Sequence, residues 1–329
     1  MSITPGTQKT LDLILETNYS DLTVLSFGGG QDSTTILFKL VLDKKFRARY
    51  ISKNGKLLVL FANTHNEHPE TYKYIEDIII PFCKKHEIEF VKIDNTMGFH
   101  GKTWQSLTYQ WKLNKPTIGS TAFTKSCSHN LKLIPQYNYV EQWLPKNYSK
   151  VNNKTRKDNY VQFSKYYGKI TWLIGIAKGE ESRVADANKE TAKWKRQAVE
   201  VKYPLIDFGL DRQACQDYIK SINKPIPMPS NCMFCPFSCN HMELLWLEKS
   251  YPEKFDEWIE LEQAKLDAHK DVPKNLGVSG KLHKTGDRKG QAVTLRDMLN
   301  EAKEKYPNVT LNELNEWKWS HGHLVCTKY

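Results

Sequence analysis

The sequence predicts an α/β fold in which a doubly wound parallel sheet is followed by a mostly helical C-terminal extension. Two short apolar segments, residues 22–27 and 57–62, each precede a longer segment with apolar residues at helical intervals, residues 33–42 and 71–86. Strands that alternate with helices of this length pair in parallel through right-handed crossovers. A sheet of this kind binds its ligand at the carboxyl ends of the strands.

Further elements follow the same pattern. Residues 88–93 and 170–177 are apolar segments that we expect to be the third and fourth strands. Asp211 is a suitable N-cap for a helix over residues 211–222. Beyond it, an extended chain is favoured by three prolines, Pro225, Pro227 and Pro229. Helical periodicity returns over residues 241–269 and 294–305, with a Gly/Lys-rich linker over residues 271–290.

The length of 329 residues exceeds that of a typical single domain. We expect a nucleotide-binding domain over residues 1–228, and a cysteine-rich loop with helices over residues 229–329. Residues 145–169 are rich in Lys, Asn, Ser and Tyr and predict a mobile insertion or a phosphate-contacting arm. The clustered cations of this segment are Lys146, Lys150, Lys154, Arg156 and Lys157.

The composition is that of a globular protein, with 40% hydrophobic and 26% charged residues. No apolar run approaches the roughly 20 residues of a membrane span, and the first residues lack an export pattern, so a cytoplasmic protein without a membrane partner is expected. The net charge of +11 favours a polyanionic partner such as nucleotide phosphates, tRNA or DNA. A basic surface that is merely solvated is the alternative, and the oligomeric state is not predicted.

A glycine-rich loop joins the first expected strand to the first helix, where backbone N–H groups and the positive helix end can bind an anion. The glycines let a phosphate approach the backbone, the hydroxyls can donate hydrogen bonds, and Asp32 can hold Mg²⁺ or cap the helix. The residues expected to bind nucleotide here are Ser26, Phe27, Gly28, Gly29, Gly30, Gln31, Asp32, Ser33 and Thr34. Their spacing departs from the Rossmann G-x-G-x-x-G pattern and lacks the lysine of a Walker A loop.

The loop resembles the PP-loop, Ser-x-Gly-Gly-x-Asp-Ser, of the N-type ATP pyrophosphatases and adenosine phosphosulfate reductases, with one extra glycine and Gln31 in this chain. That resemblance implies a HUP-like fold that binds ATP or a related adenine nucleotide with Mg²⁺. Residues 63–71, Asn-Thr-His-Asn-Glu-His-Pro-Glu-Thr, look like the family segment Asp-Thr-Gly-x-x-x-Pro-Glu-Thr beside the nucleotide. Asn63 stands where the family has an acid and His65 where it has a glycine. The resemblance implies nucleotide contacts from Asn63, Glu67, Glu70 and Thr71.

Residues 175–183 resemble the family segment whose Glu-Ser-Arg element closes over the phosphates. Gly175 is expected beside the nucleotide, Arg183 can engage phosphate oxygens bidentately, and Lys178 adds a point charge. Together with Asp32, Lys178 and Arg183 are the expected catalytic groups.

Cysteines form a tight group at positions 232, 235 and 239, and in a reducing compartment such spacing favours metal binding or catalysis over disulfides. The stretch from Ser126 to Pro135 is similar to one in the DNA phosphorothioation branch of the PP-loop proteins, where the comparable cysteines hold an iron–sulfur cluster. This implies a four-thiolate site of Cys127, Cys232, Cys235 and Cys239. Either Zn²⁺ or a [4Fe-4S] cluster suits such a site.

Three cysteines lie outside that group. Cys83 and Cys215 fall in apolar helical patterns and are expected to be buried thiols. Near the C-terminus, His321, His323 and Cys326 are either a packed tail or a segment that folds over the active site.

The leading functional expectation is ATP-dependent activation of an acceptor with release of pyrophosphate, followed by sulfur transfer from a sulfur donor, with a nucleic acid as the acceptor. The second expectation is a phosphoadenosine phosphosulfate reductase. In such an enzyme a thiolate attacks the sulfur of the sulfonucleotide, and a thioredoxin-like protein then resolves the intermediate. The third is a non-catalytic nucleotide sensor that docks on nucleic acid or on a protein.

Overall fold

The computed structural model describes residues 20–113, 115–152 and 156–321. The chain divides into two compact units. The first unit comprises Met1–Ala62, Lys73–Phe99 and Leu133–Pro227, and the second comprises Asn63–Tyr72, His100–Lys132 and Met228–Tyr329. The last junction lies one residue from the boundary expected after residue 228. Two earlier segments of chain also belong to the second unit, so neither unit is continuous in sequence.

The first unit is built on a five-stranded sheet in which every neighbouring pair is parallel. The α/β class with a parallel sheet is therefore confirmed. The order β3-β2-β1-β4-β5 places the change of winding direction between β1 and β4, where sheets of this kind leave a crevice at their carboxyl edge. The strands are β1 (Leu22–Ser26), β2 (Lys56–Ala62), β3 (Glu89–Ile93), β4 (Ile170–Ile174) and β5 (Val199–Lys202).

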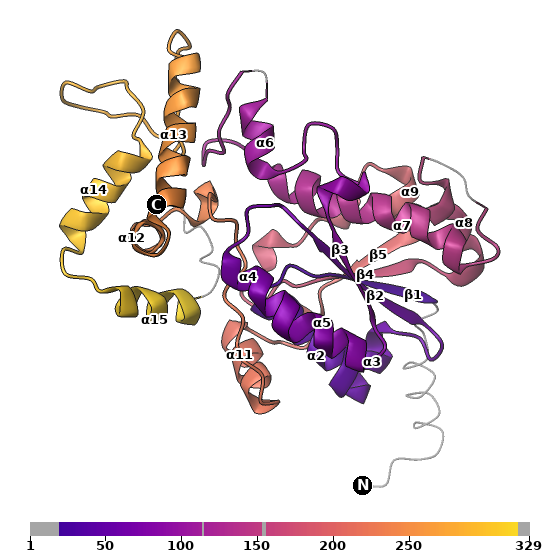
Figure 1. Ribbon diagram of the computed structural model, residues 1–329. Helices are drawn as coiled ribbons and strands as arrows, with labels where there is room; N and C mark the ends of the chain where they lie inside the picture. The colour runs from indigo at the N-terminus through magenta and orange to yellow at the C-terminus, as the bar shows by residue number, and fades with distance from the viewer. Residues whose placement is uncertain (1–19, 114, 153–155, 322–329) are drawn as a thin grey trace. The chain divides into compact units, whose positions relative to one another are not determined.

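Helices cover both faces of this sheet. Figure 1 shows α2, α3, α5 and α11 on one side, with α7, α8 and α9 on the other. Alternation along β1 sends Leu22 and Val24 into the cluster built on α7 and α8. The helices of this unit are α2 (Gln31–Leu42), α3 (Lys44–Tyr50), α5 (Ile80–Lys85), α7 (Ile134–Asn147), α8 (Asp158–Tyr167), α9 (Lys193–Ala198), α10 (Pro204–Asp207) and α11 (Arg212–Ser221).

The basic segment, in its described residues 145–152 and 156–169, is more regular than its composition suggested. It contains the end of α7 and all of α8, which packs Tyr160 and Phe163 into the sheet's core. The prediction of a mobile insertion is wrong for α8, because these aromatic residues at helical spacing bury one face of the helix. Lys157 also departs from its expected role, since its ammonium donates to Asn138 Oδ1 at 2.8 Å and lies over Trp194.

The second unit is mostly helical and has its own core around Phe234, Trp246, Phe255 and Trp258. The single helix expected over residues 241–269 is two helices, because Pro252 has no N–H to continue the first. The helices are α6 (Leu107–Lys112), α12 (His241–Ser250), α13 (Pro252–Ala268), α14 (Leu295–Lys305) and α15 (Leu311–His321). One helical segment runs through both units, as α4 (Pro69–Tyr74) and then the π-helix Ile75–Ile79 lead into α5.

Short helices complete the description. They are the 3₁₀ turns Asn95–Met97, Glu181–Arg183, Ala187–Lys189 and Pro236–Ser238, and the π-helix Ser128–Leu133. Within the described ranges, no helix combines the length and the apolar character needed to cross a membrane.

Candidate functional site

The glycine-rich loop lies at the carboxyl end of β1 and passes directly into α2. Gly29 has a φ of +79°, a conformation that favours glycine, and Gly30 forms the N-cap of α2 without a side-chain hydrogen bond to the first turn. The first N–H groups of α2 therefore remain free to meet an anion at the positive end of the helix. Asp32 lies in this first turn, where it makes no capping bond.

Several loop side chains maintain the loop itself. Ser33 Oγ accepts from Gly28 N at 3.1 Å and donates to Gly30 O at 3.3 Å. Gln31 donates to Pro227 O at 3.1 Å and accepts from Gln216 at 2.9 Å, while the buried Phe27 ring packs edge-on against Phe90. These side chains were expected at the nucleotide, but the structure uses them to fix the backbone that would contact it.

Thr34 differs from its neighbours, since its buried hydroxyl has no hydrogen-bond partner in the described chain.

Gly175 follows β4 and touches the start of α2. A Cβ at this position would lie 3.0 Å from Ser33 N and 3.2 Å from Asp32 Cβ. A Cβ here would be tighter than ordinary packing and would make the loop or the end of β4 shift by a few tenths of an ångström, so glycine suits this close approach. The segment after Gly175 is held near α11, since Lys178 N donates to Leu210 O at 2.8 Å.

A charged cluster surrounds Asp32. Glu180 is buried and joins two guanidinium groups, with Arg183 at 2.5 Å and Arg212 at 2.7 Å. Burial raises the pKa of Asp32 to about 6, against the opposing effect of Arg212; Glu180 adds to the rise and Arg183 also opposes it. The expected Lys178 side chain is exposed at the edge of this cluster.

Arg212 was not anticipated from the sequence. It is the first residue of α11, whose N-cap Asp211 accepts from Ala214 N at 2.8 Å, as predicted. The signal was present, because an arginine directly after a helix cap near the carboxyl edge of the sheet is well placed to reach the ligand crevice. Its pairing with Glu180, a residue 32 positions earlier, could not be deduced from spacing.

In the second unit, the segment after β2 forms a tight polar turn. Asn63 Oδ1 accepts from His65 N at 2.9 Å and from the Tyr72 hydroxyl at 2.8 Å. His65 has a φ of +58°, which is the left-handed conformation that glycine adopts most easily.

Glu67 occupies the centre of a buried group in this unit. Its Oε1 atom is 2.8 Å from Lys132 Nζ, 3.1 Å from Thr64 Oγ1 and 3.7 Å from Cys232 Sγ. Burial alone would lower the pKa of Lys132, but the nearby Glu67 carboxylate raises it above its usual range. Lys132 therefore stays charged and compensates the buried carboxylate.

Unsatisfied polar atoms gather along the same segment. Buried atoms without a hydrogen-bond partner in the described residues are Asn66 Nδ2, Glu67 Oε2, both ring nitrogens of His68, Glu70 Oε2 and Thr71 Oγ1. Buried polar groups are nearly always hydrogen-bonded in folded proteins. This concentration of unsatisfied buried groups includes three residues expected at the nucleotide, Glu67, Glu70 and Thr71.

His68 also adjoins a buried ion pair. Lys318 of α15 lies 2.5 Å and 2.6 Å from the two carboxylate oxygens of Glu243, and His68 Nε2 is 3.9 Å from the same carboxylate. Burial, with the Lys318 charge, lowers the pKa of His68 well below its usual value. The ring is therefore neutral near pH 7.

The four cysteines expected to bind metal all lie in the second unit. Cys127, Cys232 and Cys239 pack against one apolar core, and the buried Cys235 interacts electrostatically with both Cys127 and Cys232. Burial raises the pKa of the Cys127 and Cys232 thiols, which are therefore not pre-ionised by Lys125 and Lys132. Within the described residues, no three His, Cys, Asp or Glu side chains are already gathered at metal-binding distances.

Four thiols from one unit are a donor set that suits a soft metal, and the Glu67 carboxylate lies beside one of them, 3.7 Å from Cys232 Sγ. His321 is the last residue of α15, and the rest of the expected tail site, His323 and Cys326, lies outside the described residues.

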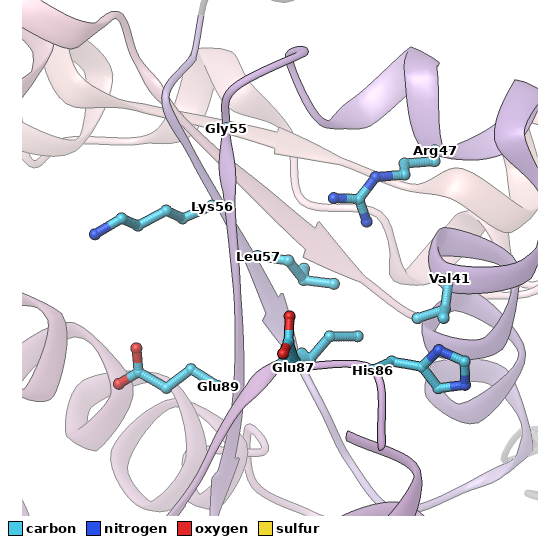
Figure 2. Close-up of a pocket in the computed structure, with 9 residues that line it drawn as sticks. Val41, Arg47, Gly55, Lys56, Leu57, His86, Glu87 and Glu89 are labelled. Carbon is cyan, nitrogen blue, oxygen red and sulfur yellow. The ribbon is translucent and has the colours of Figure 1, made fainter. Parts of the chain in front are cut away.

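A separate hollow of about 560 Å³ lies at the opposite edge of the sheet, beside the first residues of β2 and β3 (Figure 2). Its charged lining residues have mixed signs: Arg47, Lys56, His86, Glu87 and Glu89. None of the residues expected to act on a nucleotide lines it.

No protein-family model, curated protein or solved structure matches this chain.

Proposed function

We propose that the first unit binds ATP at the carboxyl edge of its sheet and transfers the adenylyl group to an acceptor oxygen, as PP-loop enzymes of HUP-like fold do. The observation that carries the proposal is the joining of three features at one place. These are the glycine loop leading into α2, the close approach of Gly175, and the pair of arginines held by Glu180.

Each feature has a distinct task in holding a triphosphate. The free N–H groups of α2 and the glycine backbone bind phosphate oxygens without a side chain between them. The Thr34 hydroxyl supplies a further donor. Arg183 and Arg212 add charge-assisted hydrogen bonds, and the shared Glu180 carboxylate fixes both guanidinium groups before the ligand arrives.

Asp32 is the carboxylate best suited to hold Mg²⁺ in this unit. A pKa of about 6 leaves it ionised at neutral pH but poorly solvated, so a bound cation would replace missing solvation. Mg²⁺ held here would neutralise phosphate charge, while the chain's own groups position the substrate.

The reaction needs no acid–base pair of unusual strength. An acceptor oxygen forms a bond to the α-phosphorus, the bond from that phosphorus to the bridging oxygen breaks, and pyrophosphate leaves. Arg183 and Arg212 would meet the charge that develops on the leaving group. Positioning and charge neutralisation account for most of the rate in such transfers.

The second unit supports a sulfur-transfer step after adenylation. A sulfur nucleophile from a donor displaces AMP from the activated acceptor, which then carries sulfur in place of oxygen. Cys127, Cys232, Cys235 and Cys239 would hold Zn²⁺ or a [4Fe-4S] cluster, which would supply a structural centre or a sulfur-handling one. The net charge of +11 favours a nucleic acid as the acceptor.

The test is exchange of labelled pyrophosphate into ATP, with and without added RNA or DNA. We expect exchange by the native protein and a loss of about tenfold or more in Arg183→Ala, because one charge-assisted contact is worth about 1.5–3 kcal/mol. Arg296→Ala removes an exposed arginine of α14 and should be unaffected.

Absence of exchange with any acceptor would overturn the proposal. Release of sulfite from phosphoadenosine phosphosulfate with a thiol reductant would point instead to a sulfonucleotide reductase. Nucleotide binding without either reaction would indicate a sensor.

A further inference from the structure

A basic and aromatic patch lies on the first unit, at the amino edge of its sheet. The parallel register brings the first residues of the strands to this edge, opposite the glycine loop, and Lys56 is the first residue of β2. Lys169 directly precedes β4, and Tyr148 donates from its hydroxyl to Asp21 O, immediately before β1.

Contacts connect Lys56, Tyr148 and Lys150 with Tyr166, and Lys165 and Lys169 lie close to Tyr166 along the chain. Lys56 Nζ lies 5.3 Å from the centre of the Tyr148 ring, which packs on Tyr167 at 4.8 Å. Lys150 N donates to the Tyr167 hydroxyl, and Lys150 Nζ lies 5.4 Å from the centre of the Tyr166 ring. We call the group of Lys56, Lys150, Lys165, Lys169 and Tyr166 the amino-edge patch.

The patch has the charge and exposure of a docking surface. Its four lysines are exposed, and none is held in an ion pair with a described carboxylate. Residues 145–169 contain one acid, Asp158, among seven cations. Tyr166 is 54% exposed, so its ring is accessible among these lysines.

We propose that the amino-edge patch docks a nucleic acid with unpaired bases. The lysines would neutralise successive backbone phosphates, and Tyr166 would stack on a base while Lys150 approaches the ring. An anionic membrane would use the lysines equally well and is an outcome of the test, but the exposed Tyr166 ring beside Lys150 is the pairing of aromatic ring and cation that stacks on an unpaired base next to its phosphate. We therefore take a single-stranded nucleic acid as the occupant of the amino-edge patch.

The position of the patch defines its role. Because it lies at the opposite edge of the sheet from the glycine loop, it tethers a nucleic acid without touching the nucleotide. Figure 2 shows Lys56 running outward from the hollow, away from Val41 and Arg47. The docking does not depend on the proposed adenylation. In a nucleic-acid-dependent reaction, removal of the patch would raise KM for the nucleic acid and leave kcat unchanged.

The experiment measures anisotropy of a labelled DNA single strand and of its duplex between about 50 and 200 mM salt, where phosphate contacts are strongly salt-dependent. The variant Lys150→Gln/Lys165→Gln/Lys169→Gln should bind at least about tenfold more weakly. Its slope of log affinity against log salt should fall by about 2 to 3, since each phosphate contact contributes about 0.7 to 0.9.

A matched control removes three exposed lysines of the second unit, in Lys281→Gln/Lys284→Gln/Lys289→Gln. It should retain native affinity. Tyr166→Ala should weaken single-strand binding about fivefold or more, and duplex binding much less, because stacking on an unpaired base is lost. MgATP binding should be native in the patch variant, which separates a failure of docking from a failure of the proposed function.

Three results would overturn the proposal. These are equal losses in the patch variant and the control, a Tyr166→Ala variant with native single-strand affinity, or capture by phosphatidylserine vesicles without binding of either DNA.

Discussion

Asp32 lowers the stability of the folded protein at neutral pH, and it is also the carboxylate proposed to hold Mg²⁺. Its carboxyl lies in the first turn of α2, where burial and the nearby Glu180 outweigh two arginines and raise its pKa to about 6. A residue chosen for stability alone would not place a poorly solvated acid there. Strain of this electrostatic kind is typical of ligand sites.

Asp32→Asn should therefore stabilise the free protein at pH 7.5. The folded-state pKa is raised, so the protonated carboxyl is favoured on folding, and stability is lost as pH rises from about 4 through 6. An asparagine avoids that loss, which is at most about 3 kcal/mol, since each pKa unit corresponds to about 1.4 kcal/mol.

Urea denaturation of the two proteins at pH 5.0 and 7.5 measures this difference in the free energy of unfolding. The gain should be clearly smaller at pH 5.0. The raised pKa of Asp32 would be contradicted by a variant that is less stable than the native protein at pH 7.5. A gain in the free energy of unfolding that does not change with pH would also contradict it.

At the scale of elements, the carboxyl edge of the sheet depends on segments that are distant in sequence. The glycine loop and Gly175 were predictable, because a strand, a glycine-rich turn and a helix leave clear local signals. The short strand β5 was not, since the alternation of its four residues Val199–Lys202 is too short to stand out from the preceding α9. α8 was obscured by the lysines and asparagines that precede it, although its aromatic residues have helical spacing.

The pairings within the site were less predictable than its elements. Glu180 bridging Arg183 and Arg212 depends on how α11 packs on α2, and long-range packing leaves no periodic signal in one sequence. The grouping of Glu67 with Lys132 and Cys232 is similar, since three separate segments supply it. A resemblance could suggest these residues but not their contacts.

The cysteine loop is the element whose content can be measured most simply. After anaerobic purification, we expect either about four irons with sulfide, in a brown protein, or one zinc per chain. Cys235→Ala should lose the metal. Cys83→Ala, which removes a buried thiol of the first unit, should keep it. A native protein that contains neither metal would contradict the proposed four-thiolate metal site.

At the scale of the whole molecule, the two units contain different kinds of chemical groups. The first contains the parallel sheet, the glycine loop and the arginine pair. The second contains the cysteines, the unsatisfied polar segment from residue 66 to 71 and the buried Glu243–Lys318 pair. The chain passes between the units at the end of β2 and within α4.

The most direct test of the central claim is a calorimetric titration with MgATP of the native protein, Gly175→Ala and Gly101→Ala. Gly101 has room for a Cβ, with its nearest neighbour 3.9 Å away, whereas Gly175 does not. We expect saturable one-to-one binding by the native protein and Gly101→Ala, and about tenfold or more weaker binding by Gly175→Ala, a change of about 1.4 kcal/mol. A native protein that shows no saturable binding, or a folded Gly175→Ala that binds MgATP as tightly as the native protein, would contradict the account.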